Sequence, residues 1–117
     1  MIFHITRMEE WEKATQEGMY TSQHLEKEGF IHCADPHQII KVANSLFQNQ
    51  TGLAILAIDP TQVSAEIKYE DLYNVGEDFP HIYGPLNIEA VICVSTFGPE
   101  NDGTFRLPTR MKELLRD

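Results

Sequence analysis

Short stretches of apolar and polar residues alternate along the chain and predict strands and helices in turn. Residues 2–6, 30–34, 53–59, 65–70 and 89–97 have the apolar runs or the alternation typical of strands. The run at 53–59 is continuously apolar, which predicts a central strand covered on both faces, and 89–97 is predicted to be a second buried strand. The alternation at 65–70 predicts a strand at a sheet edge or with one face in solvent.

Capping residues predict two helices between the first strand, 2–6, and the second strand, 30–34. Thr6 and Glu9 have the spacing of a capping box, which opens a predicted helix over about 7–17. Ser22 is predicted to cap a short helix that ends at Gly29, because glycine accepts the left-handed conformation at helix ends.

A third helix is predicted from Pro36 to about Gln48. Asp35 has the position of its N-cap, Pro36 fits the first helical position, and Gln38 fits the reciprocal cap. The apolar face of this helix is expected to be buried and consists of Ile39, Ile40, Val42, Ala43, Leu46 and Phe47. A last helix is predicted over 107–116, and the order of elements predicts an α+β fold.

Length and composition favour one domain spanning residues 1–117, with a core over 1–97 and a loop and helix over 98–117. The 117 residues are 42% hydrophobic, enough for a compact core. No apolar run approaches the ~20 residues that cross a bilayer, so no membrane association is expected. The first fifteen residues lack the apolar segment of a signal peptide, so we expect a cytoplasmic protein.

The net charge is −9, and such a field repels phosphate backbones, so nucleic acid is not an expected partner. Four of the nine basic residues lie within the last twelve positions, namely Arg106, Arg110, Lys112 and Arg116. They predict a solvated face of the last helix, and docking on the acidic body or contact with an anionic ligand are the alternatives.

Three histidines lie in apolar surroundings although they are distant in sequence. His4 is in the first predicted strand, His32 ends the strand at 30–34, and His81 lies in the proline-bounded segment 78–86, which is predicted to be a packed loop. Titratable groups gather at functional sites, so we predict that the three imidazoles share a partly open cleft, with Tyr83 beside them. His24 and His37 have polar surroundings and are expected at the surface.

The two cysteines lie in apolar strand-like segments. Cys33 and Cys93 are therefore expected to be reduced and buried rather than joined in a disulfide. Successive strand residues point to opposite faces, so Cys33 and His32 cannot act as a nucleophile–base pair.

Three stretches resemble the bacterial family called domain of unknown function 952. They are FHIT (3–6), EGFIHCADPHQIIKVAN (28–44) and FPHIYGPL (79–86), and the resemblance runs from Ile2 to about Val94. That family is grouped with the ADP-ribosyltransferase-like fold. The resemblance implies two small packed β-sheets with flanking helices and a nicotinamide-type cleft between the sheets.

The same resemblance implies NAD, ADP-ribose or a related nucleotide as ligand, and glycosyl or ADP-ribosyl transfer as the reaction. His4 resembles the first-strand histidine that grips the nicotinamide ribose, and His32 takes the place of the tyrosine that stacks on the nicotinamide ring. The transferase glutamate has no match in the sequence. The candidate catalytic residues are His4, His32 and His81, and the candidate ligand-binding residues are Thr6, His32, Tyr83 and Gly84.

Two other functions are compatible with these residues. The histidines can be structural parts of a non-enzymatic interaction domain. Alternatively, three neutral imidazoles from separate strands can hold a tetrahedral zinc ion with one open position. The sequence identifies no certain cofactor, and NAD enters the first hypothesis as a substrate.

Overall fold

The protein is described here by a computed structural model of residues 1–116, so the last residue of the predicted domain lies outside the described residues. Its strands are β1 (Ile2–Arg7), β2 (Met19–Tyr20), β3 (Ile31–His32), β4 (Leu53–Ile58), β5 (Glu66–Glu70), β6 (Phe79–Tyr83), β7 (Leu86–Asn87) and β8 (Val91–Phe97). Its helices are α1 (Met8–Glu17), α2 (Gln23–Glu28), α3 (Ile39–Leu46) and α4 (Thr109–Leu114), with 3-10 turns η1 (Pro60–Gln62) and η2 (Ile88–Ala90).

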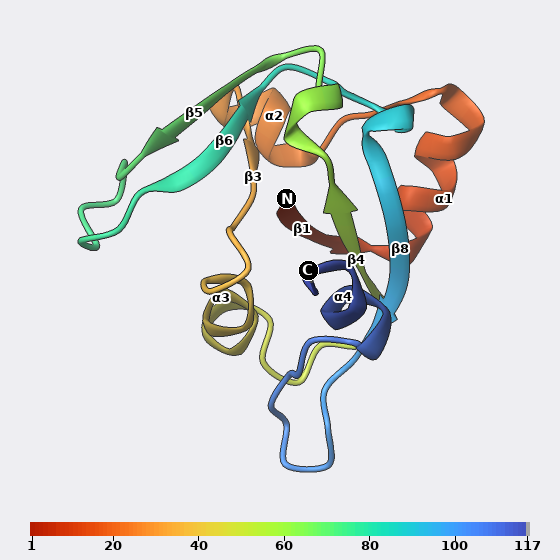
Figure 1. Ribbon diagram of the computed structural model, residues 1–117, viewed down its shortest axis with the longest axis vertical. Coiled ribbons are helices and arrows are strands. Elements are labelled where there is room, and N and C mark those ends of the chain that lie inside the picture. Colours follow the sequence, from red (N-terminus) through yellow and green to blue (C-terminus); the bar gives the residue numbers. More distant parts are fainter. Residues whose placement is uncertain (117) are drawn as a thin grey trace.

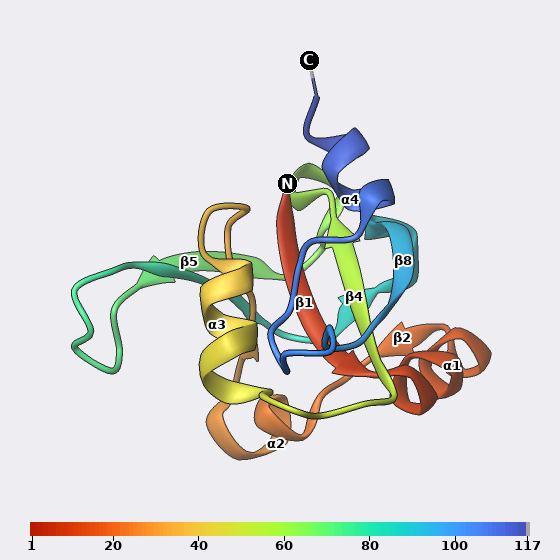
Figure 2. The same ribbon diagram turned by 90° about the horizontal axis from the view of Figure 1, so that it is seen from below.

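The strands form small antiparallel sheets, which confirms an α+β architecture. One sheet has the order β1-β4-β8, a second has the order β3-β6-β5, and β2 pairs with β7. Figure 2 shows β1, β4 and β8 side by side, with β5 running away from them.

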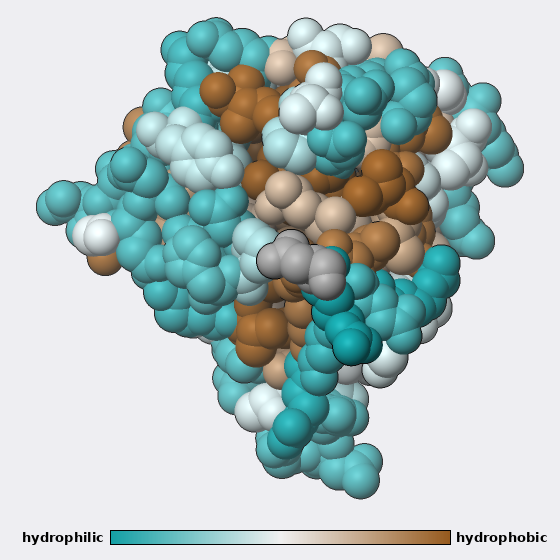
Figure 3. Space-filling view, viewed as in Figure 1, coloured by the Kyte–Doolittle hydropathy of each residue, from teal (hydrophilic) through white to brown (hydrophobic). Residues whose placement is uncertain are grey.

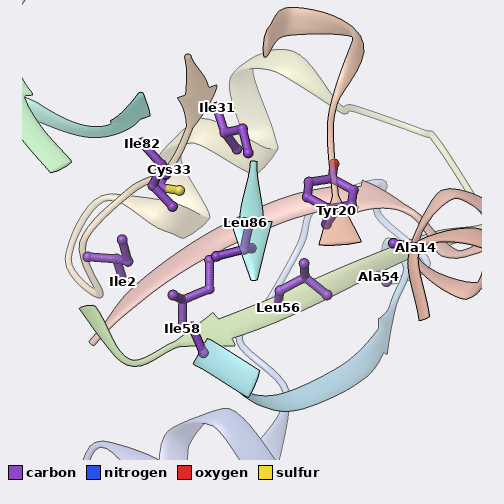
Figure 4. Packing of buried hydrophobic residues seen from close by; sticks show 11 residues of the cluster. Ile2, Ala14, Tyr20, Ile31, Cys33, Ala54, Leu56, Ile58, Ile82 and Leu86 are labelled. Atoms are coloured by element: carbon purple, nitrogen blue, oxygen red, sulfur yellow. The ribbon is translucent and has the colours of Figure 1, made fainter. Parts of the chain in front are cut away.

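The central strand β4 is buried along its whole length, as its continuous apolar run predicts. Alternate residues of β4 enter two different hydrophobic clusters. Ala54, Leu56 and Ile58 pack with Ile31, Ile82 and Leu86 of the other strands, and Figure 4 shows Leu86 reaching toward Ile58. Leu53, Ile55 and Ala57 belong to the second cluster, on the opposite face of the sheet, with Phe3, Ile39, Ala43, Phe105 and Met111.

The predicted neighbourhood of the first two strands and the predicted position of α3 are both confirmed. Phe3 and Ala34 form an isolated antiparallel bridge, with backbone N···O distances of 2.8 and 2.9 Å. The helix α3 packs its buried residues Ile39 and Ala43 onto the β1-β4-β8 sheet. Strand β3 is shorter than the strand predicted at 30–34, because only Ile31 and His32 pair continuously with β6.

The predicted capping box at Thr6 is wrong. Thr6 stays within β1, the N-cap of α1 is Arg7, and no side chain caps that end. Thr6 instead faces the hydroxyl group of Tyr20, and Glu9 forms an ion pair with Arg7 at 2.8 Å. Sequence spacing alone could not show that this hydroxyl has a better partner across the fold.

The start of the third helix also differs from the prediction. The Gln38 side chain accepts a hydrogen bond from the Asp35 backbone as expected, but α3 begins only at Ile39, after a turn. The Asp35 carboxylate accepts from the Tyr69 hydroxyl at 2.8 Å instead of capping α3. At the other end, Leu46 is 69% exposed rather than buried, because α3 ends there and turns away from the sheet.

The segment 78–86, predicted as a loop, contains strand β6 at the centre of the β3-β6-β5 sheet. Pro80 has no N–H for a neighbouring strand, but it lies beside Cys33, just past the end of β3, where its carbonyl accepts from the Cys33 backbone at 3.1 Å. His81 is therefore held by a strand on each side rather than by a proline-locked loop.

The segment 89–97 is not a fully buried strand. Its β8 portion is the edge of the β1-β4-β8 sheet, and Ile92 is 46% exposed. For this reason Cys93 is only half-buried, whereas Cys33 is buried, and both thiols are free as predicted.

The surface of the view in Figure 3 is hydrophilic around the rim and apolar toward the middle. Within the described residues, no helix combines the length and apolar character needed to cross a membrane.

Replacing Leu56 by Ala should lower the free energy of unfolding by about 2–5 kcal/mol, because it leaves a cavity beneath a fully buried strand. Replacing Leu46 by Ala is the matched control and should change this free energy by less than about 0.5 kcal/mol, since its side chain is 69% exposed. Urea denaturation measures both values, and equal losses would contradict this description of the core.

Cys93 should react with a thiol reagent before Cys33 does in the native protein. Burial raises the pKa of the Cys33 thiol, which suppresses its thiolate, and the same burial blocks access of the reagent. Mass spectrometry of partly labelled protein gives the order, and faster labelling of Cys33 would be the contrary result.

Candidate functional site

The pairing of β3 with β6 brings two of the three predicted histidines together. His32 and His81 are directly opposite one another in the ladder, so their side chains share one face of the sheet. Their ring centroids lie 5.4 Å apart in an edge-to-face arrangement.

His81 is the buried member of this pair. Its ring stacks on Phe30 with a centroid separation of 4.3 Å, and its Nδ1 lies 3.0 Å from Oε1 of Glu70 on the neighbouring strand β5. The strand order β3-β6-β5 therefore places a carboxylate beside the histidine pair.

Tyr83 shares this carboxylate with His81. Residues two apart on a strand point the same way, and the Tyr83 hydroxyl donates to Oε1 of Glu70. The hydrogen bond raises the pKa of Tyr83 to about 12 and, together with the contact to His81, lowers the pKa of Glu70. Lys68 lies over the Tyr83 ring, with Nζ 4.9 Å from the centroid. Glu70 is thus held as an anion at neutral pH.

His32 is partly exposed and has further aromatic neighbours. Its ring centroid lies 4.8 Å from those of His24 and Phe30, and 5.9 Å from that of Tyr73. Burial lowers the pKa of His32, which favours the neutral imidazole.

A second carboxylate stands beside His32. Oε1 of Glu28 lies 3.4 Å from Nε2 of His32, and Oε2 accepts from the Tyr73 hydroxyl at 2.6 Å. This hydrogen bond is the main cause of the lowered pKa of Glu28 and raises the pKa of Tyr73 to about 12. The exposed end of the site therefore combines aromatic rings with an anion.

His4 lies behind this surface and is fully engaged by protein groups. Its Nδ1 is 2.5 Å from the carbonyl oxygen of His32, and its Nε2 is 2.8 Å from the Tyr20 hydroxyl, which lies 2.9 Å from Oγ1 of Thr6. Burial lowers the pKa of His4 to about 4, so the ring is neutral at neutral pH. Nδ1–H then donates to the carbonyl, Nε2 accepts from Tyr20, and neither ring nitrogen is left for a ligand.

The other two predicted ligand-binding residues lie apart from the exposed rings. Thr6 belongs to the buried network of His4 and Tyr20. Gly84 has a φ of +154°, and a Cβ there would lie 2.9 Å from Cβ of Ala65. Glycine at this position is thus explained by close chain packing after β6.

Two surface hollows, of about 200 and 390 Å³, have no histidine among their lining residues. The first is formed by α1, β2 and the start of α2, and the second by the loop around Glu100 and Arg106. Across residues 1–116, no group of three or more His, Cys, Asp or Glu side chains is placed to hold a metal ion, so the zinc alternative gains no support.

Four residues around His32 and His81 were not predicted to be part of a site: His24, Glu28, Glu70 and Tyr73. His24 lies at the surface as expected, but its contact with the ring of His32 was not predicted. Glu28 lies within the stretch 28–44 but gives no signal of its own. Alternation over 65–70 places Glu70 on a strand, yet only strand order shows that it faces His81.

Comparison with known proteins places the chain in a family. The family model described as protein of unknown function (DUF952) matches residues 5–94. The chain belongs to the DUF952 family. No curated protein matches the chain.

Solved structures of one protein share the fold. The crystal structure of protein CC0527 from Caulobacter crescentus is 28% identical in sequence, with a TM-score of 0.84, over 95% of this chain and 97% of that chain. A double mutant of CC0527 gives a TM-score of 0.83 at the same coverage, and its solution NMR structure gives 0.78 over 97% of this chain and 96% of that chain. This likeness extends beyond the DUF952 match, so it includes part of the C-terminal segment.

The buried state of His4 predicts a specific loss of stability in acid. Its pKa is 6.5 when unfolded and about 4 when folded, so below pH 6.5 the unfolded chain binds a proton that the folded chain does not. The contribution of neutral His4 to the free energy of unfolding is complete above pH 6.5 and is lost as the pH falls toward 4. Between pH 7 and pH 5 the wild type should lose roughly 2 kcal/mol more than His4→Gln.

Urea denaturation at the two pH values measures this difference, and His37→Gln, at an exposed histidine, is the control that should follow the wild type. Parallel losses in the wild type and His4→Gln would show that His4 does not remain neutral in the fold.

Proposed function

We propose that this DUF952 protein binds NAD, ADP-ribose or a related nucleotide at the surface around His32 and Glu70, and transfers the ribosyl part. The observation that carries the proposal is the cross-strand pair of His32 and His81 with a carboxylate, Glu28 or Glu70, beside each member. A histidine with a purely structural role needs only its own hydrogen-bond partners. Several titratable and aromatic groups gathered in one place are typical of functional sites.

The proposal includes an ADP-ribosyltransferase-like fold. Two three-stranded antiparallel sheets, β1-β4-β8 and β3-β6-β5, are joined through the bridge between Phe3 and Ala34. This arrangement supports the two-sheet architecture that the family resemblance implies, with His32 at the end of the connecting strand.

His32 would contribute a flat, neutral ring for stacking. Its lowered pKa keeps the imidazole uncharged at neutral pH, so a planar cation such as the pyridinium ring of NAD meets no repulsion from it. Phe30 extends the aromatic surface beside His32. The nearby carboxylates add attraction for a positively charged ring.

Glu70 is our candidate for the acidic group that the sequence analysis missed. When the bond between the ribose carbon and nicotinamide nitrogen breaks, nicotinamide leaves with the electron pair and positive charge develops on the ribose. A carboxylate held as an anion by Tyr83 and His81 would stabilise that charge until an acceptor hydroxyl or water forms the new bond.

His4 would position the site rather than touch the ligand. Both of its ring nitrogens are engaged by protein groups, and one of them holds the carbonyl oxygen of His32. Lys68, over the Tyr83 ring, is the cation nearest to this tyrosine and is our candidate for contact with a ligand phosphate.

A second candidate function is a non-enzymatic interaction domain with structural histidines. It is favoured by the complete pairing of buried side chains: within the described chain, no buried side-chain nitrogen or oxygen lacks a hydrogen-bond partner. It is also favoured by the position of the two surface hollows, neither of which contains a histidine.

Thermal unfolding with NAD, ADP-ribose, nicotinamide and AMP separates the two functions. A ligand at 100 times its Kd should raise stability by about 2.7 kcal/mol, because it binds only the folded chain. His32→Ala should abolish this shift while the melting temperature of the free protein changes little, since its ring is partly exposed. His37→Ala is the matched control and should retain the shift.

Two results would end the proposal. One is the absence of a shift with every nucleotide, and the other is an equal shift in His32→Ala and the wild type. Release of nicotinamide from NAD then tests catalysis: Glu70→Gln should bind NAD and lose at least about 100-fold in rate, as for removal of one charge-stabilising group.

A further inference from the structure

We propose that Tyr73 controls access to His32: its ring occupies the place over His32 that a planar ligand ring takes, and it must leave when such a ligand binds. The ligand class rests on the proposed function, whereas the control of access rests on the contacts of Tyr73 alone.

The geometry around His32 singles out Tyr73. The ring of Tyr73 is inclined by only 20° to that of His32, whereas Phe30, His81 and His24 are inclined by 57°, 74° and 79°. Three neighbours therefore meet His32 at steep angles, and only Tyr73 lies nearly parallel to the imidazole, as a stacked ligand ring would.

A hydrogen bond fastens Tyr73 in this position. Its hydroxyl donates to Oε2 of Glu28 at 2.6 Å, and the other oxygen of the same carboxylate lies 3.4 Å from Nε2 of His32. A planar ring with an N–H or O–H donor at its rim would satisfy Glu28 in the same way. The carboxamide of nicotinamide is such a donor, so the contacts of Tyr73 define the ligand as an aromatic ring with a rim donor.

The chain around Tyr73 lies at the surface, outside the hydrophobic core. Tyr73 lies in the connection between β5 and β6, which projects from the body in Figure 1. Tyr73 is 56% exposed, and its loop neighbours Leu72 and Val75 are 51% and 60% exposed. The Asp71 carboxylate accepts from the backbone of Val75 and Gly76, which holds the turn together as one unit.

Few contacts hold this connection to the rest of the chain. Besides the bond from Tyr73 to Glu28, Glu77 contacts Gln38 and Lys41, and the Gln38 side chain donates to the Asp78 carbonyl at 2.9 Å, all near the start of β6. Breaking the Tyr73 contact would uncover the ring of His32 without disturbing a buried side chain.

Acylation of histidine by diethyl pyrocarbonate, followed site by site by mass spectrometry, tests access directly. His32 should react about fivefold faster in Tyr73→Phe, because one exposed hydrogen bond to a charged group is lost, and faster still in Tyr73→Ala. Val75→Ala, at an exposed residue of the same loop, is the matched control and should leave the rate at His32 unchanged.

Other histidines serve as internal references in the same samples. Exposed His37 should react at one rate in all variants, and buried His81 should stay protected. Unchanged acylation of His32 in both Tyr73 variants would overturn the proposal, as would a rise in His81 acylation equal to that of His32, which would indicate general loosening.

Nicotinamide as the probe then tests the ligand class. It should protect His32 from acylation and bind Tyr73→Ala more tightly than the wild type by more than about fivefold, the same factor by which acylation of His32 rises in that variant, because no closed state competes. If Tyr73→Ala exposes His32 and nicotinamide protects neither protein, access control is supported and the ligand class of the proposed function is overturned. Tighter binding to the wild type would overturn competition between Tyr73 and the ligand.

Discussion

Burial of β4 on both faces is the constraint on which the rest of the structure depends. Each residue of this strand enters a hydrophobic cluster, so both faces of the β1-β4-β8 sheet must be covered. Helix α3, Phe105 and Met111 cover one face. The other face is covered by Tyr20, Leu86 and the β3-β6 pair, which fixes the second sheet against the first. The position of His32 and His81 follows from this second covering layer.

Strand β1 places two polar residues, His4 and Thr6, in this buried layer, where other protein groups form hydrogen bonds with them. His4 and Thr6 alternate with apolar residues of β1, and both point toward the layer that contains Tyr20. A buried imidazole needs a donor and an acceptor, and Tyr20 and the His32 carbonyl supply them. The same hydrogen bond that satisfies His4 therefore ties the core sheet to the backbone of His32.

The second sheet carries the side chains that gather around this point. Its middle strand β6 presents His81 and Tyr83, and its edge strand β5 presents Glu70 to both. The loop beyond β5 returns to the end of α2 through Tyr73 and Glu28. Segments far apart in the sequence thus meet as two carboxylates among aromatic rings, in a chain whose net charge is already −9. Such a surface attracts a positively charged ring such as a pyridinium.

The sequence by itself determined the elements whose signals are local. The continuous apolar run of β4, the cap of α2 by Ser22 and the turn at Gly29 depend on neighbouring residues only, and the structure contains them as predicted. The family membership was also present in the sequence, since the two longer motifs, 28–44 and 79–86, lie within the matched residues 5–94. His32 and His81 could be named as candidates for the same reason.

Tertiary structure alone decided which side chains meet. The role of Thr6 depended on Tyr20, the strand nature of 79–83 depended on β3 and β5 on either side, and the exposure of Cys93 depended on β8 being an edge. The same holds for His4, whose ring nitrogens are both engaged by groups distant in sequence, and for Glu28, Glu70 and Tyr73. Strand order and long-range hydrogen bonds are set by the simultaneous burial of many residues, and no local pattern encodes them.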